Sequence, residues 1–202
     1  MKSQDVAIGL RAKTGRAIVV VVGGTRDAPL ILVKTEIKLW DPKFPATGQP
    51  YHHVMDLPGD EWPQAVQKSA RAIEKIAVKS LATLMKEQAA KGRTVRAVAT
   101  VGAKDRNLAS IGNPHIRAHA AEGILFRRVL DSAAQKNGLP SRAFAEREFD
   151  QILKQELGMK SNAVKKKLDD AARALPPPWR ADEKLAAMAA WLVLHQLQNR
   201  ER

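Results

Sequence analysis

Three acidic residues are candidates for chemistry in this chain: Asp182, Glu183 and Glu36. Asp182 and Glu183 are adjacent at the expected start of the last helix, and Glu36 lies near the end of an expected strand. Carboxylates gathered in this way bind Mg²⁺ or Mn²⁺, and a pair of such ions can flank and activate a phosphate group. A structural interpretation is also open, because acids in the first helical turn interact favourably with the helix dipole and alternating strand residues face solvent.

Two histidines and a glutamate form a second candidate group. His115, His119 and Glu122 are spaced by four and three residues, so they share one face of an expected helix. Two imidazoles one helical turn apart can bind Zn²⁺ or a similar ion. The residues between them do not supply the glutamate of the zinc-protease motif, and short ligand patterns often occur without a metal. We therefore expect no metal site here, and the loop pair His52 and His53 is a weaker candidate still.

Basic residues strongly outnumber acidic ones. The chain has 34 Lys and Arg against 21 Asp and Glu, which gives a net charge of +13. An excess of this size favours a polyanionic partner, because neutralising phosphates releases counterions. Any single basic residue can be an ordinary solvated charge, but the whole set favours nucleic acid. The candidate phosphate-binding residues are Arg11, Lys13, Arg16, Lys104, Arg106, Lys165, Lys166 and Lys167.

Composition excludes several classes of protein. The chain has no cysteine, which excludes disulfides, thiolate zinc sites and a cysteine nucleophile. Its 45% apolar content argues against disorder. No apolar run is long enough for a membrane span or a signal peptide, so we expect a cytoplasmic protein that does not bind membranes. A length of 202 residues predicts one domain over residues 1–202.

The hydrophobic pattern predicts an α/β order of elements. Strands are expected over residues 6–10, 17–22 and 30–39, followed by an irregular loop at about 40–60 in which residues 51–54 form a short strand. A long helix over 61–90, a buried strand over 95–101 and a helix over 114–135 come next. The part from 141 to 200 is mainly helical after a short strand at 142–146. Three antiparallel strands, then parallel strands flanked by helices, is the order of the ribonuclease H-like mixed sheet.

Several segments of the chain resemble RuvC-type Holliday junction resolvases, and they occur in that family's order. The first is the hairpin at residues 6–22. The others are AAEGIL at 120–125, NGLP at 137–140, the acidic stretch at 146–148, GMKSNAV at 158–164 and PWRADEKLAAMA at 178–189. The resemblance covers most of the chain apart from residues 40–90. It implies a ribonuclease H-like fold and a nucleic-acid substrate.

The resemblance also implies four carboxylates that hold two Mg²⁺ ions, and this chain departs from that pattern. The acid of the first strand falls on Arg11, and the acid of the later strand falls on Ala99, with Thr100 beside it. Of the two acids on the last helix, one matches Asp182 and the other falls on Leu185. A cation cannot bind Mg²⁺ but suits a phosphate. We therefore expect the catalytic site to be lost.

The leading interpretation is a nucleic-acid-binding protein of this fold that needs no cofactor and contacts the phosphates of structured or duplex nucleic acid. The resemblance favours DNA over RNA and implies a homodimer, with residues 115–135 as a candidate interface. Two alternatives stay open. One is a Mg²⁺- or Mn²⁺-dependent endonuclease with a relocated site made of Asp182, Glu183 and Glu36. The other is a protein-interaction module whose basic surface meets an acidic partner.

Overall fold

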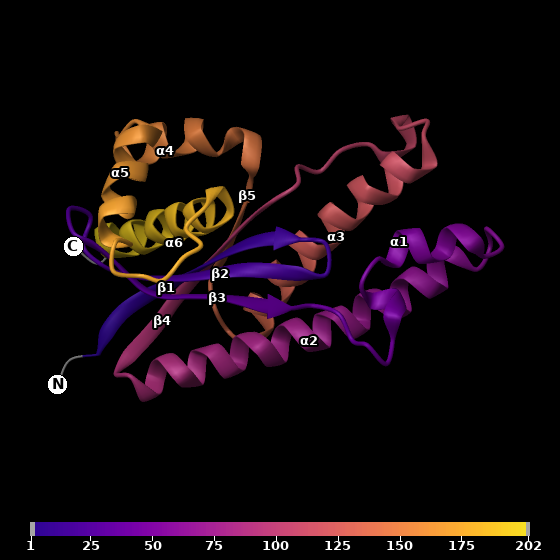
Figure 1. The fold of residues 1–202 in the computed structure, drawn as a ribbon, viewed down its shortest axis with the longest axis horizontal. Helices are drawn as coiled ribbons and strands as arrows, with labels where there is room; N and C mark the ends of the chain where they lie inside the picture. Colours follow the sequence, from indigo (N-terminus) through magenta and orange to yellow (C-terminus); the bar gives the residue numbers. More distant parts are fainter. Residues whose placement is uncertain (1–2, 201–202) are drawn as a thin grey trace.

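The apolar strands form one mixed sheet in the computed structural model, which describes residues 3–200 (Figure 1). The sheet has five strands in the order β3-β2-β1-β4-β5. The first three, β1 (Gln4–Lys13), β2 (Arg16–Gly24) and β3 (Pro29–Lys38), are antiparallel neighbours. β4 (Arg93–Gly102) runs parallel to β1, and β5 (Ser141–Ala145) runs parallel to β4. This topology confirms the predicted α/β sheet of antiparallel and then parallel strands.

Helices cover both faces of the sheet, which explains why its central strands are apolar on both sides. α2 (Trp62–Ala90) and α3 (Pro114–Lys136) pack on one face, over a core that includes Ile8 and Val21. α4 (Phe149–Leu157), α5 (Ser161–Ala171) and α6 (Ala181–Arg200) lie on the other face, over Ala7 and Val20 (Figure 1). Successive residues of a strand thus belong to different cores.

A glycine in β1 allows α6 to pack unusually close to the sheet. A Cβ atom added to Gly9 would lie 1.8 Å from the backbone oxygen of Ala186 in α6. Any side chain at this position would push the helix away from β1, since heavy atoms do not approach one another so closely. Gly9 therefore fixes how near the start of α6 comes to the end of β1.

The proline-rich segment after β3 contains short helices where the sequence predicted a loop with a strand. A 3-10 turn spans Pro45–Thr47, α1 spans Pro50–His53, and a second 3-10 turn spans Val54–Asp56. The predicted short strand at 51–54 is wrong. Pro50 supplies the physical reason, because proline is favoured in the first turn of a helix, where its missing N–H is not needed.

No helix within the described part of the chain is both long enough and apolar enough to cross a membrane.

Candidate functional site

Four charged side chains meet where the parallel strands end and α6 begins. In β1, Ala7 and Gly9 face α6, so Arg11, two residues further along, faces the same side. Arg11 pairs in register with Val101 of β4, and Glu146 directly follows β5. Asp182 lies in the first turn of α6. We refer to the group formed by Arg11, Lys13, Glu146 and Asp182 as the Arg11 centre.

The guanidinium group of Arg11 links the two carboxylates of this centre. Its Nε donates to Asp182 Oδ1 at 3.1 Å, and its Nη2 donates to Glu146 Oε2 at 2.5 Å. A third, longer contact of 3.5 Å reaches the carbonyl oxygen of Val101. The side chain of Arg11 is only 11% exposed, so these contacts replace most of the water that would solvate its charge. The arginine is thus an integral part of the folded centre.

Asp182 is held ionised by two cations. Partial burial opposes its ionisation, but hydrogen bonds from Lys13 and Arg11, together with their charges, outweigh burial and lower the pKa of Asp182 below its usual value. Lys13 Nζ lies 3.2 Å from Asp182 Oδ2. The carboxylate therefore stabilises the folded state wherever it stays charged.

The residues of the Arg11 centre do not fit a pair of Mg²⁺ ions. Such ions need several carboxylates with free oxygen atoms, whereas the two carboxylates here are bound by a guanidinium group that lies between them. Neither Ala99 nor Val101, which face the same side of β4, can supply an oxygen ligand from its side chain. Leu185 packs into the core beneath α6.

The other two predicted catalytic acids have different contacts. Glu183 is 7% exposed, and its Oε2 accepts a hydrogen bond of 2.9 Å from the backbone N–H of Arg180, which caps the start of α6. Glu36 lies on β3, two strands away from β1, and pairs with Arg16 at 2.7 Å. The structure therefore brings only Asp182 of the three acids into the Arg11 centre, and it adds Glu146.

Sequence reasoning missed the role of Glu146 because its strand is short. In the sequence, the acidic stretch at 146–148 stands out only through the resemblance. The available signal was topological: the carboxyl ends of neighbouring parallel strands meet at one edge of a sheet. Glu146 directly follows β5, so this rule places it at the edge of the sheet where β1 also ends.

A hollow whose lining holds three cations and two acids adjoins the Arg11 centre. It has a volume of about 390 Å³ and is lined by residues 102–106, Glu146 and Arg147. Lys104 contributes to this lining and pairs with Glu148. Arg106, which also lines the hollow, is exposed. Two of the predicted phosphate-binding residues therefore lie beside Arg11, in a concave surface.

The predicted lysine run lies at the other end of the sheet. Lys165, Lys166 and Lys167 belong to α5. Lys167 Nζ donates to the carbonyl oxygen of Asp27 at 3.1 Å, in the turn between β2 and β3. This turn is at the opposite end of β2 from the hairpin that follows Arg11. The predicted basic residues thus divide into two groups.

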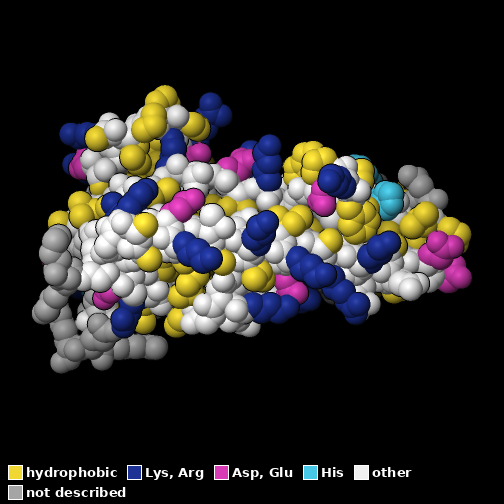
Figure 2. Space-filling model, turned by 90° about the horizontal axis from the view of Figure 1, so that it is seen from below, with side chains coloured by type: hydrophobic (Ala, Val, Ile, Leu, Met, Phe, Trp, Pro, Cys, Tyr) yellow, Lys and Arg dark blue, Asp and Glu magenta, His cyan; other side chains and the backbone are white. Residues whose placement is uncertain are grey.

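A third basic surface, which the sequence analysis did not include, runs along α2. Five exposed cations follow one another at helical spacing on this helix, and Figure 2 shows Lys and Arg side chains spread over this side of the molecule. The sequence carries this signal, because successive cations are three, four, four and seven residues apart and therefore share one face of a helix. The residues are Lys68, Arg71, Lys75, Lys79 and Lys86.

The histidine candidates lie away from the Arg11 centre, at the start of α3. His115 and His119 are exposed, whereas Glu122 is completely buried and accepts a hydrogen bond of 2.8 Å from His52 Nδ1. Glu122 therefore binds the side chain of His52, and it is not positioned as a metal ligand itself. His52, which the sequence analysis ranked below the other two, completes a group of three imidazoles.

The order and direction of the strands, with helices on both faces, are those of the ribonuclease H-like fold. The chain resembles the structure of Thermus thermophilus RuvC with a TM-score of 0.51 and 13% sequence identity, over 96% of each chain. The T. thermophilus RuvC complex with a Holliday junction substrate gives 0.50 and 13%, over 96% of this chain and 95% of that one. The yeast mitochondrial Holliday junction resolvase Ydc2 gives 0.49 and 10%, over 100% and 84%.

No family model matches the sequence, and no curated protein matches it either. At identities near 13%, the structural similarity shows a shared fold. The resemblance seen in the sequence is confirmed at that level: this chain has the fold of RuvC-type resolvases.

Proposed function

We propose that this protein binds structured or duplex DNA through phosphate contacts and does not cleave it. The observation that carries the proposal is Arg11, a buried cation that binds the two carboxylates at the place where the resembled enzymes hold metal ions. With a guanidinium group bound to both of its carboxylates, the centre is not arranged to hold two metal ions around a scissile phosphate.

The binding half of the proposal rests on charge and on fold. The chain carries a net charge of +13, and cations line the hollow beside the Arg11 centre as well as the exposed side of α2. The RuvC structure that shares this fold was solved in complex with a Holliday junction. Duplex and junction DNA are therefore the nucleic acids that we expect this surface to bind, with most of the affinity coming from phosphates.

The oligomeric state and the domain organisation belong to the same proposal. We expect residues 1–202 to act as one domain and the chain to form a homodimer, as the resemblance implies. Light scattering of the purified protein tests the dimer, and a substitution of the exposed Arg128 in α3 by Glu would weaken it if this helix forms the interface.

The binding test is fluorescence anisotropy with a four-way junction, a duplex and a single strand, each at two salt concentrations. We expect junction and duplex to bind more tightly than the single strand, with an affinity that falls steeply as salt increases. Double substitution of Lys104 and Arg106 by Ala should weaken binding and reduce the salt dependence. Absence of binding at physiological salt would contradict the proposal and favour a protein-interaction module.

A further inference from the structure

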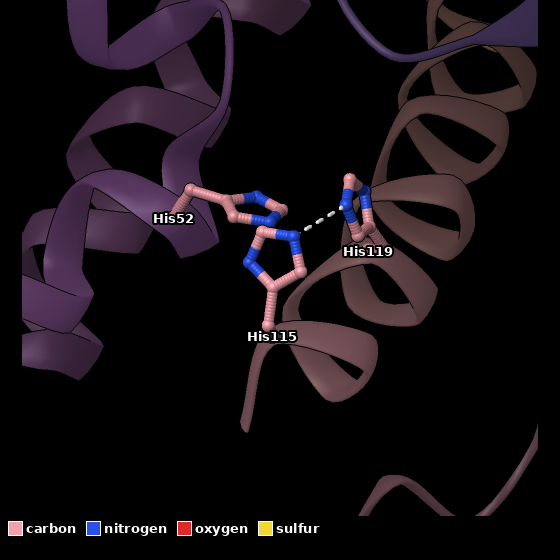
Figure 3. A group of neighbouring side chains, drawn as sticks. All are labelled: His52, His115 and His119. Atoms are coloured by element: carbon pink, nitrogen blue, oxygen red, sulfur yellow. Dashed lines mark hydrogen bonds between the residues drawn. The ribbon is translucent and has the colours of Figure 1, made fainter. Parts of the chain in front are cut away.

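Three imidazole rings meet where α1 packs against α3 (Figure 3). One ring nitrogen from each of His52, His115 and His119 lies within 4.8 Å of the other two. The Nε2 atoms of His115 and His119 are 3.1 Å apart. A tetrahedral Zn²⁺ ion with bonds of about 2.0–2.1 Å separates its ligand nitrogens by roughly 3.3–3.4 Å. The group therefore needs shifts on the order of 1 Å to surround such an ion.

Glu122 fixes the orientation of His52. Its carboxylate Oε1 accepts hydrogen bonds from the Nδ1 of His52 at 2.8 Å and from the backbone N–H of the same residue at 3.3 Å. A carboxylate only accepts hydrogen bonds, so Nδ1 carries the proton and Nε2 of the neutral ring keeps its lone pair. A carboxylate that holds one nitrogen of a histidine while the other binds a metal is a recurring arrangement of metal sites.

The free nitrogen of His52 is buried and has no hydrogen-bond partner among residues 3–200. The second oxygen of Glu122, Oε2, is likewise buried without a partner in that part of the chain. Buried polar atoms without partners cost free energy, and a buried carboxylate needs a positive charge nearby. A divalent ion bound to Nε2 of His52 would satisfy the nitrogen and offset the charge of Glu122.

An ion can reach this position from solvent. His115 and His119 are exposed, and both belong to the first two turns of α3. The start of that helix is fixed by Asn113, whose side chain accepts a 3.0 Å hydrogen bond from the N–H of Ile116. Two histidines four residues apart then lie on one face, opposite His52 of α1. Three protein ligands leave a fourth position for water or another donor.

From this geometry we propose that His52, His115 and His119 form a binding site for a divalent transition-metal ion of the Zn²⁺ class, in which Glu122 acts as a positioning residue. Imidazole ligands suit Zn²⁺, Co²⁺ or Ni²⁺ and disfavour Mg²⁺. The site is separate from the Arg11 centre and does not depend on whether the protein binds DNA. Its structural effect is to attach α1, and with it the segment between β3 and α2, to α3.

The test is a titration of chelator-treated full-length protein with Zn²⁺, followed by calorimetry and thermal unfolding. We expect one ion per chain and, at a free concentration near 100 times the dissociation constant, a rise of about 5–10 °C in the unfolding midpoint. Co²⁺ should give the visible absorption of a tetrahedral complex. Zn²⁺ should also slow hydrogen exchange in α1, whereas Mg²⁺ should have no effect on any of these measurements.

His53 provides a matched control, because it is an exposed histidine next to His52 and outside the group. His119→Gln should abolish the rise in midpoint and the Co²⁺ spectrum, while His53→Gln should retain both. His119 is exposed, so its substitution should leave the fold intact, which circular dichroism checks. The proposal is overturned if no ion binds at one per chain, if binding survives His119→Gln, or if His53→Gln abolishes it.

Discussion

The Arg11 centre and the histidine cluster both contain carboxylates, and the two regions balance the negative charge differently. In the Arg11 centre, a guanidinium group of the same chain binds Asp182 and Glu146. In the histidine cluster, the buried carboxylate of Glu122 accepts from the imidazole and the backbone N–H of His52, and the other nitrogen of that imidazole has no partner within the described residues. The first centre is complete without an ion, whereas the second has ligands and an unmet charge.

Two different observations can suggest a metal site: the position of a centre in the fold, and the local chemistry of its side chains. The position of a centre in a fold suggests a metal site by resemblance alone, but a single cation such as Arg11 occupies the ligands that an ion would need. Unpartnered donor atoms and an uncompensated carboxylate indicate a site from local chemistry alone. Experiments that remove the cation from the first centre, or the ligands from the second, test this distinction.

The largest effect is expected from Gly9→Ala, which acts on the Arg11 centre through the backbone. The new Cβ would collide with the oxygen of Ala186 and push α6, with Asp182, away from β1. We expect a loss of about 3 kcal/mol or more in the free energy of unfolding, because backbone atoms in the core cannot move aside. Urea denaturation measures the loss. Gly112→Ala is the control, since nothing lies within 4 Å of a Cβ there, and an equal effect of both would contradict the packing argument.

Arg11→Met should destabilise the protein by about 2 kcal/mol at neutral pH, because it leaves two carboxylates without their shared cation. The pKa of Asp182 is lowered in the folded state, so its contribution is present above the pKa of the unfolded chain and is lost as pH falls through the folded value. The difference between wild type and Arg11→Met should therefore shrink in acid.

Urea denaturation of both proteins between neutral pH and about pH 3 measures this change. Adding Glu146→Gln to Arg11→Met should restore part of the stability at neutral pH, since it removes a carboxylate that has lost its Arg11 partner, whereas Asp182 keeps Lys13. A difference between the two proteins that stays constant over the whole pH range would show that packing, and not charge, explains the role of Arg11.

Arg11→Asp should turn the first centre into one that responds to metal. The new carboxylate would join those of Asp182 and Glu146, which then lack their guanidinium partner. We expect Mn²⁺ to raise the unfolding midpoint of this variant by a few degrees while having no effect at this centre in the wild type. His119→Gln is included in both backgrounds so that the histidine cluster contributes nothing. An equal response of both proteins would show that Arg11 does not block a metal.

The smallest effects concern the affinity for DNA. Each phosphate contact that is removed should reduce the slope of log affinity against log salt by about 0.9. Lys104→Glu with Arg106→Glu acts on the hollow beside the Arg11 centre and should reduce the slope by about two such steps. Charge reversal of Lys165–Lys167, at the other end of the sheet, should also weaken binding and flatten the slope. An unchanged slope for either set would exclude it from the interface.

The sequence predicted the order of strands and helices well, because buried parallel strands and long amphipathic helices have strong periodic signals. It placed Arg11 and Asp182 in one region through the resemblance. It did not predict the helical turn at Pro50, since a proline-rich stretch of a few residues has no period to detect. For the same reason it underrated His52, which is separated from His115 by 62 intervening residues and meets it only through packing of α1 on α3.

Other contacts of the site were beyond the sequence for physical reasons. Glu36 and Glu183 have the residue type of metal ligands, but an adjacent arginine and a free backbone N–H compete for their carboxylates. Such competition depends on side-chain geometry. The α2 stripe, by contrast, was visible as a repeat of cations and could have been included.

Incubation of a labelled four-way junction with the wild-type protein in Mg²⁺ or Mn²⁺, followed by a denaturing gel, tests most directly whether the protein binds DNA without cleaving it. We predict intact strands under conditions in which anisotropy shows the junction to be bound. Cleavage in Mn²⁺ that disappears in Asp182→Asn would contradict the account and establish an active nuclease that uses this carboxylate.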